Sequence, residues 1–315
     1  MMTPPAAPID PQCLRIPWDG EGAPYAIVDL ATVQDATPWH LPPCPLIGIG
    51  TPDHVRAKDV DLLIEPPASL AMIVAAITAQ PRAAAILVQL LRLIEGMDPA
   101  TALVAESLAY GLLQGSEGHA RWLATRTPVP AAAPGEIQLD RTDDQLTITL
   151  DRAHAHNAID RTLRDGLREA FDLAALDRDI ARISLHGAGR SFSVCADLSE
   201  FGTTRDPATA HAIRMVTLPA HAIIGCADRL EAHVQGACVG SALEMAAFAT
   251  RLTASPSAWF HLPELAMGII PGAGGCVSVS RRIGRQRAAL MILSGRRINA
   301  ATALDWGLID AIMDD

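Results

Sequence analysis

Two glutamates in apolar surroundings are the residues of this sequence best suited to acid–base chemistry. Residues 236–275 read GACVGSALEMAAFATRLTASPSAWFHLPELAMGIIPGAGG, with Glu244 after Gly-Ser-Ala-Leu and Glu264 after Phe-His-Leu-Pro. Burying an unpaired carboxylate costs several kcal/mol, so an acid among Leu, Met, Ala and Pro is exposed, paired or functional. Two such acids beside glycine-containing turns form a candidate general acid and base. The alternative is two glutamates on helix surfaces.

The composition favours a large apolar core and argues against a polyanionic partner. The chain has 315 residues, of which 50% are hydrophobic and only 4% aromatic, enough for one large domain or two small ones. Its net charge of −10 makes nucleic acid an improbable main partner. The six cysteines lack CxxC or zinc spacing, as is typical of reduced cytoplasmic proteins, so we expect no metal site.

The sequence shows no secretory or membrane signal that we can identify. The first residues lack a basic stretch followed by an apolar one, so we expect no signal peptide. The apolar run over residues 86–94 is short and is interrupted by Gln89 and Arg92. We therefore expect a soluble protein without a membrane partner.

Proline and glycine clusters divide the chain into segments of different pattern. Short apolar runs at residues 25–30, 45–49 and 60–64 predict strands, and four capped apolar patterns follow as helices. Alternating strand and helix patterns after the proline-rich stretch PVPAAAPGE indicate a layered α/β architecture. The predicted order is a flexible arm (1–24), short strands (25–66), a helical segment (67–127), a linker (128–136) and a core (137–315).

Six motifs within residues 146–313 resemble those of the crotonase superfamily, which contains the enoyl-CoA hydratases and isomerases. They occur in the family's order and with near-family spacing. The resemblance implies an α/β fold, the crotonase (ClpP-like) spiral of ββα units, assembled into homotrimers or homohexamers. The motifs read HNAIDRTLRDGL, GAGRSFSVCADLSEF, HVQGACVGSALEMAA, FHLPELAMGIIPGAGG, RRIGRQRA and LSGRRINAATALDWGLID.

The same resemblance implies a lyase that acts on acyl-CoA thioesters in fatty acid metabolism, with coenzyme A as part of the substrate and no separate cofactor. Two backbone N–H groups, at Ala196 and Ser241, would stabilise an enolate oxyanion, a contribution of ~3–4 kcal/mol. Glu244 and Glu264 match the two catalytic glutamates of hydratases. One would activate water for attack at Cβ, and the other would protonate Cα.

Further substrate-binding residues follow from the matched positions. Gly240 would let the backbone approach the ligand closely, and Gly272 belongs to a loop that would present backbone N–H groups to the substrate. The other candidates have structural alternatives: an inert packed thiol, a packing histidine, a solvated loop arginine. These candidates are Cys195, His261, Arg190 near a CoA phosphate, and Trp122 near the adenine.

Three residues depart from the family pattern around the oxyanion turns. Cys195 replaces a glycine, and Ser241 and Ala242 replace two more. If a turn needs positive φ, a side chain there costs of order 1–3 kcal/mol. An isomerase, another crotonase hydrolase or lyase, and a catalytically silent CoA-binding subunit therefore stay open as alternatives to a hydratase.

The order of segments is the second departure. Residues 60–130 resemble the helical section that normally follows the crotonase core, although here they precede it. We therefore expect a helical cap in circularly permuted order, packed over Glu244 and Glu264 of its own or a neighbouring core. An unrelated helical module for partner binding is the alternative.

Overall fold

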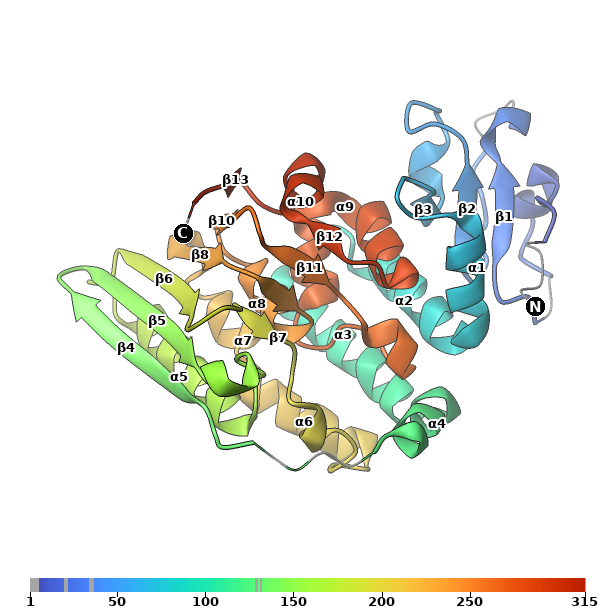
Figure 1. The fold of residues 1–315 in the computed structure, drawn as a ribbon. Helices are drawn as coiled ribbons and strands as arrows, with labels where there is room; N and C mark the ends of the chain where they lie inside the picture. The colour runs from blue at the N-terminus through green and yellow to red at the C-terminus, as the bar shows by residue number, and fades with distance from the viewer. Residues whose placement is uncertain (1–5, 20–21, 34–36, 128–129, 131, 315) are drawn as a thin grey trace.

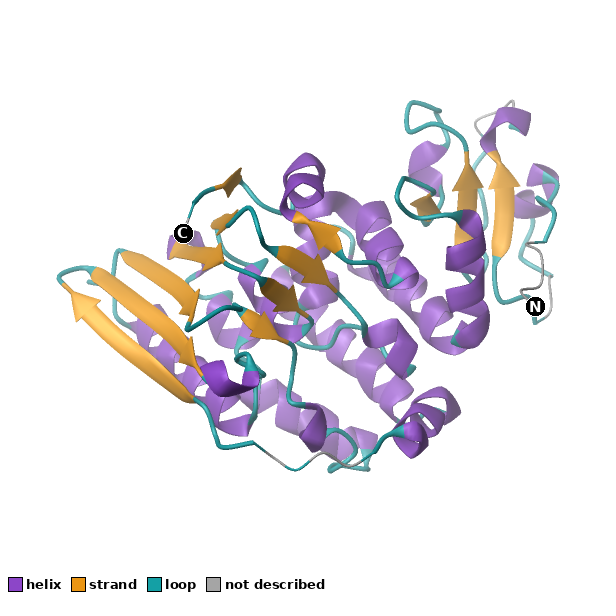
Figure 2. Cartoon of the chain, viewed as in Figure 1, coloured by secondary structure: helices purple, strands orange, loops and turns teal. Residues whose placement is uncertain are grey.

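Three β-sheets and a set of covering helices make up the computed structural model, which describes residues 6–19, 22–33, 37–127, 130 and 132–314. Figure 1 shows a small N-terminal sheet at one end of the molecule and the long hairpin β4–β5 at the other. Figure 2 shows the helices gathered between and behind the sheets. Parts of the predicted arm and of the predicted linker lie outside the described residues.

The N-terminal sheet is parallel, with strand order β1-β2-β3. Its strands, β1 (Ala26–Asp29), β2 (Leu46–Ile49) and β3 (Leu62–Leu63), lie within the three apolar runs that predicted them. Residues of the predicted arm form a 3₁₀ helix, η1 (Pro11–Arg15), whose Leu14 is buried. Leu14, Leu30 and Val60 belong to a hydrophobic cluster of this sheet's own.

Four helices follow the small sheet and begin where local sequence signals predict. Three of the helices are capped by side chains, those of Ser69, Asp98 and Ser116, which accept hydrogen bonds from N–H groups three residues later. The fourth begins with Pro81 at its first helical position. The helices are α1 (Leu70–Ala79), α2 (Pro81–Ile94), α3 (Pro99–Gln114) and α4 (Glu117–Thr125).

Within the described chain, no helix on its own has the length and apolarity needed to cross a membrane. Only α1 and α2 taken together reach that length and composition, and they meet at a bend of 108°. Their buried faces pack inside the protein, since residues such as Ile77, Leu87 and Leu91 are fully or almost fully buried.

The core repeats a unit of two strands in different sheets. One sheet has the order β13-β10-β8-β6-β5-β4 and the other β12-β11-β9-β7. Each of β6, β8 and β10 in the first sheet is followed along the chain by β7, β9 or β11 in the second. This alternation is the predicted crotonase spiral. The strands are β4 (Glu136–Thr142), β5 (Gln145–Asp151), β6 (Arg182–Gly187), β7 (Ser193–Val194), β8 (Leu230–Val234), β9 (Ala237–Val239), β10 (Arg251–Ala254), β11 (Trp259–His261), β12 (Ile298–Asn299) and β13 (Ala311–Ile312).

The core helices cover these sheets and share one hydrophobic cluster with α2 and α3. One of them has a buried apolar face, because Leu163, Leu167 and Phe171 are fully enclosed. The helices are α5 (Arg161–Leu176), α6 (Pro207–Thr217), α7 (Ala220–Ile223), α8 (Ser241–Ala246), the 3₁₀ helix η7 (Glu264–Met267), α9 (Gly275–Ser294) and α10 (Ala300–Trp306).

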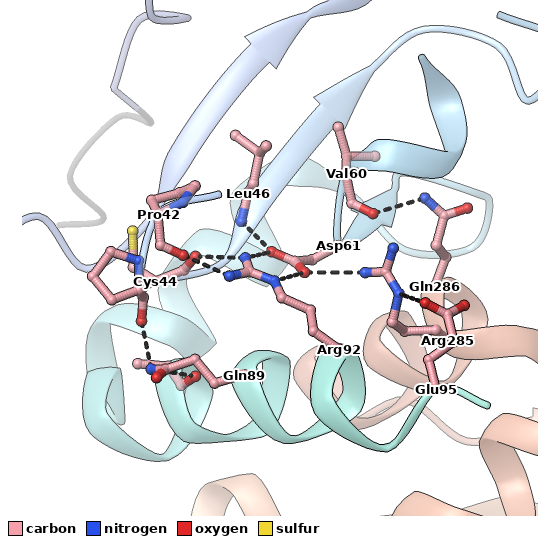
Figure 3. Close-up of polar contacts among 12 residues, drawn as sticks. Pro42, Cys44, Leu46, Val60, Asp61, Gln89, Arg92, Glu95, Arg285 and Gln286 are labelled. Atoms are coloured by element: carbon pink, nitrogen blue, oxygen red, sulfur yellow. Dashed lines mark hydrogen bonds and ion pairs between the residues drawn. The ribbon is translucent and has the colours of Figure 1, made fainter. Parts of the chain in front are cut away.

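A buried ionic network joins the N-terminal sheet to α2 and α9 (Figure 3). Asp61, only 1% exposed, accepts hydrogen bonds from Leu46 N at 2.8 Å and Arg92 Nε at 2.7 Å, and its Oδ1 lies 3.2 Å from Arg285 Nη1. Arg285 also pairs with Glu95. Arg285 on α9 therefore attaches the small sheet to the core.

We predict that Asp61→Ala destabilises the protein by about 3–5 kcal/mol, because it leaves two largely enclosed guanidinium groups without their shared carboxylate. Urea unfolding at neutral pH measures the loss. The control is Glu117→Ala, which removes an exposed pair with Arg121 and should cost at most about 1 kcal/mol. Equal effects of the two variants would contradict the proposed role of Asp61.

Candidate active site

A cavity of about 510 Å³ lies between the helical segment and the core. Helix α3 contributes Tyr110 and Gln114, and α4 contributes His119. Six of the residues singled out in the sequence line the same cavity: Cys195, Ala196, Ser241, Glu244, Glu264 and Gly272. The two glutamates are therefore buried and line one cavity, and they do not lie on separate helix surfaces.

Glu244 lies on α8 and is only 2% exposed. Its Oε2 accepts hydrogen bonds from Ala273 N at 2.6 Å and Gly275 N at 2.9 Å. Burial raises the pKa of Glu244 to about 7, although these N–H groups oppose the rise by stabilising the charged form. Near neutral pH this carboxyl group can therefore both accept and release a proton.

Glu264 begins η7 and is 5% exposed. Its Oε2 has no hydrogen-bond partner among the described residues. Burial raises the pKa of Glu264 well above its ordinary range, and the neighbouring charge of Glu244 raises it further. Two carboxyl groups in one dry cavity titrate as a coupled pair, and the less well solvated one retains its proton longer.

The two predicted oxyanion donors occupy turns that leave their N–H groups outside the secondary structure. Ser241 is the first residue of α8, where an N–H has no partner within the helix. On either side of Ala196, the Cys195 carbonyl and the Asp197 N–H bond to Ile159, which leaves the Ala196 N–H to face the other way.

Cys195 occupies this turn in a strained conformation. Its φ is +89°, in the region that favours glycine, so the expected cost of a side chain applies here. A Cβ on Gly240 would lie 2.3 Å from Cys195 Sγ and 2.8 Å from Glu264 Oε1, so only glycine fits at that position. The sulfur thus lies between the two turns and the acid pair.

The thiol of Cys195 is held in its neutral form. Burial and the charge of Glu264 raise its pKa to about 12, although the N–H groups of Ser241 and Ala196 bond to the sulfur and lower it. A thiol in this state is a poor nucleophile at neutral pH. The two N–H groups that the resemblance assigns to an oxyanion are therefore directed at a side chain.

Two further residues of the cavity region were missed in the sequence, and both come from α3. Glu106, 1% exposed, accepts hydrogen bonds from Gly274 N and Cys276 N at 2.7 and 2.8 Å. The ring of Tyr110 lies so close to Gly272 that a Cβ there would approach its Cδ2 to 2.2 Å. The signal for Glu106 was available, because it is an acid in an apolar helical run like Glu244.

Helix α4 also packs against the core, at the residues that follow Glu264. The Nδ1 of His119 lies 2.9 Å from the carbonyl oxygen of Met267. A Cβ on Gly268, whose φ is +72°, would lie 2.6 Å from His119 N. Helices α3 and α4 thus cover the cavity that contains Glu244 and Glu264, where the sequence placed the cap.

Three predicted substrate-binding side chains do not line this cavity. His261 Nε2 lies 3.0 Å from the Gly295 carbonyl oxygen, and Arg190 is an exposed loop residue. Trp122 stacks on His119, with ring centroids 5.4 Å apart, and the Arg126 guanidinium lies over the Trp122 ring at 5.1 Å from its centroid. An adjoining hollow of about 600 Å³ is lined by His119 and Arg126 but not by Trp122.

Comparison with known proteins matches the core. The family model described as Enoyl-CoA hydratase/isomerase matches residues 142–315. The 2,3-dehydroadipyl-CoA hydratase of Escherichia coli (strain K12) is 33% identical over 177 residues, 56% of this chain and 69% of that protein. The mevalonyl-coenzyme A hydratase of Beauveria bassiana is 32% identical over 54% of this chain and 64% of its own length. The chain thus spans about two thirds of these relatives.

A solved structure agrees. The enoyl-CoA hydratase from Thermoplasma volcanium GSS1 superposes with a TM-score of 0.51 and 32% identity, over 57% of this chain and 72% of that one. Helices α1–α4 precede the region that the family model matches.

We predict that Glu264→Gln stabilises the protein at pH 8 but not at pH 5. The folded protein holds the Glu264 proton more tightly than the unfolded chain, so stability falls as pH rises from about 4.5 through the raised pKa. Glutamine cannot ionise, and its advantage at pH 8 should exceed about 1 kcal/mol in urea unfolding. Exposed Glu169→Gln is the control, and a pH-independent effect of Glu264→Gln would contradict the burial argument.

Proposed function

Because the chain belongs to the enoyl-CoA hydratase/isomerase family, we propose that it adds water across the α,β double bond of an acyl-CoA thioester. The observation that carries the proposal is the convergence of Glu244 and Glu264 in one cavity that Ala196 and Ser241 also line. Isomerase relatives generally need one such acid, whereas hydration uses two. The names of the relatives support a CoA thioester with a substituted acyl group.

The roles of the two acids follow from their surroundings. Glu244, whose charge is stabilised by two N–H groups, is the base that takes a proton from water as the oxygen bonds to Cβ. Glu264, with one oxygen unpartnered, keeps its proton and delivers it to Cα. The π electrons of the double bond move toward the thioester carbonyl before Cα is protonated. A proton passed from Glu244 to Glu264 restores the starting state.

The developing charge on the thioester oxygen would be bound by the N–H groups of Ala196 and Ser241. Each such donor is worth ~3–4 kcal/mol in transition-state stabilisation. The Cys195 side chain must leave the position between them for this to occur. This requirement is also the observation that favours the second candidate, a silent subunit that binds acyl-CoA without turnover.

Other expectations from the resemblance remain predictions. They are assembly into trimers or hexamers, a cytoplasmic location, a role in fatty acid metabolism and the lack of any cofactor other than the substrate's coenzyme A.

We predict that Glu244→Gln and Glu264→Gln each lower kcat/KM for enoyl-CoA hydration by about 10²–10⁴-fold, because each removes one proton-transfer group. Hydration of a panel of 2-enoyl-CoA thioesters is followed by loss of the conjugated absorbance. Glu169→Gln on the exposed face of α5 is the matched control. An enzyme that tolerates one of the two substitutions and shifts the double bond of a 3-enoyl-CoA is an isomerase instead.

We predict that Cys195→Gly raises kcat by about tenfold or more, since it frees the two oxyanion donors and relieves the positive φ. Cys195→Ser keeps a side chain at the same position and should show no comparable gain. Steady-state kinetics of the three proteins test this. If neither variant turns over substrate although both bind CoA thioester, the silent-subunit candidate is correct.

A further inference from the structure

We infer that Glu106 is a positioning residue for the acid pair, and that through it the helical segment sets the protonation state of Glu244 and Glu264. The role of the pair itself rests on the proposed function. Glu106 comes from α3, outside the matched core, and does not line the cavity. It acts on the site through the first turn of α9.

Four consecutive N–H groups at the start of α9, residues 273–276, alternate between two carboxylates. Ala273 N and Gly275 N donate to Glu244 Oε2 at 2.6 and 2.9 Å. Gly274 N and Cys276 N donate to the two oxygens of Glu106 at 2.7 and 2.8 Å. Neither carboxylate can move without disturbing the donors of the other.

The α9 turn needs both acids because it has no cap of its own. Gly274 occupies the N-cap position and has no side chain to accept a hydrogen bond. The first N–H groups of a helix otherwise lack partners, which is costly in a buried position. The aligned dipoles of these N–H groups stabilise negative charge. The two buried carboxylates therefore receive from the α9 turn the hydrogen bonds and charge stabilisation that water would give them in solution.

The charges of the three glutamates oppose one another. Burial raises the pKa of Glu106 well above its ordinary range and ionised Glu244 raises it further, although the α9 N–H groups oppose the rise. Burial and ionised Glu244 also raise the pKa of Glu264, and the charge of Glu106 adds a smaller contribution. Glu106 bonded to the α9 turn thus helps to keep the proton on Glu264. Other titratable groups that interact with this cluster are Tyr110 on α3, Arg214 on α6, Cys276 on α9 and Cys195 in its turn, and His119 on α4 lines the cavity with Glu244 and Glu264.

Arg214 on α6 bonds to Ser107, the residue that follows Glu106 on α3. Its Nε donates to Ser107 Oγ at 2.9 Å and its Nη2 to the Ser107 carbonyl oxygen at 3.0 Å, and its guanidinium lies 4.7 Å from the centroid of the Tyr110 ring. These contacts hold Ser107 and Tyr110, which follow Glu106 on α3, against α6. Because both the α9 turn and α3 are held in place, the Glu106 carboxylate is restricted to the position between them.

The test is Glu106→Gln in the full chain, read by carbon NMR of labelled glutamate carboxyl groups. Removing the Glu106 charge should lower the pKa of Glu264, and that of Glu244 with it, by about half a unit or more. Both limbs of the pH profile of kcat/KM should move to lower pH by the same amount. Glu117→Gln, an exposed glutamate of α4, should move neither.

Two further measurements make the test decisive. If Glu106 acts through the pair, Glu106→Gln added to Glu244→Gln should change kcat/KM less than it does alone. In the unmodified protein, the amide shifts of Gly274 and Cys276 should follow the titration of Glu244 as well as that of Glu106, which requires no variant.

Two results would overturn the inference. One is that the titrations of Glu244 and Glu264 are unchanged in a folded Glu106→Gln variant. The other is that the amide shifts of Gly274 and Cys276 do not change as Glu244 titrates. An unmodified protein without hydratase activity would contradict the proposed function alone, because the NMR titrations do not depend on turnover.

Discussion

The rest of this structure depends on pairing the buried N–H groups at the start of α9. Their partners come from two places far apart in the chain: Glu244 on α8, and Glu106 on α3. The same helix holds the N-terminal sheet through Arg285 and Asp61. One helix thus connects the small sheet, the helical segment and the acid pair, and Glu244, the proposed base, also accepts hydrogen bonds from the first turn of that helix.

The site combines stabilised and strained elements. The α9 turn stabilises one negative charge, whereas the unpartnered oxygen of Glu264 and the positive φ of Cys195 both cost folding free energy. Such costs persist where the surrounding structure imposes them, and they gather at functional sites. The glycines that contact α3 and α4, Gly272 and Gly268, show how closely the helical segment is fitted to this region.

Local rules predicted much of the fold. Capping residues such as Ser69 and Asp98 mark true helix starts, and the apolar runs contain true strands. The spacing around Glu244 and Glu264 predicted two acids of one site. Local sequence marks Glu106 only as an acid in an apolar helical run, and its pairing was missed because its partners lie about 170 positions away. The sequence left a packing role open for His261, and its side chain lies against the Gly295 carbonyl oxygen because strand residues alternate in direction.

The central claim is that Glu244 and Glu264 direct water and a proton to adjacent carbons of an enoyl thioester. Its most direct test is product analysis after reaction of a 2-enoyl-CoA in ¹⁸O-labelled deuterium oxide. The account predicts a 3-hydroxyacyl-CoA with the labelled oxygen at Cβ and one deuterium at Cα. Label in a released carboxylic acid, or a migrated double bond without labelled oxygen, would contradict it.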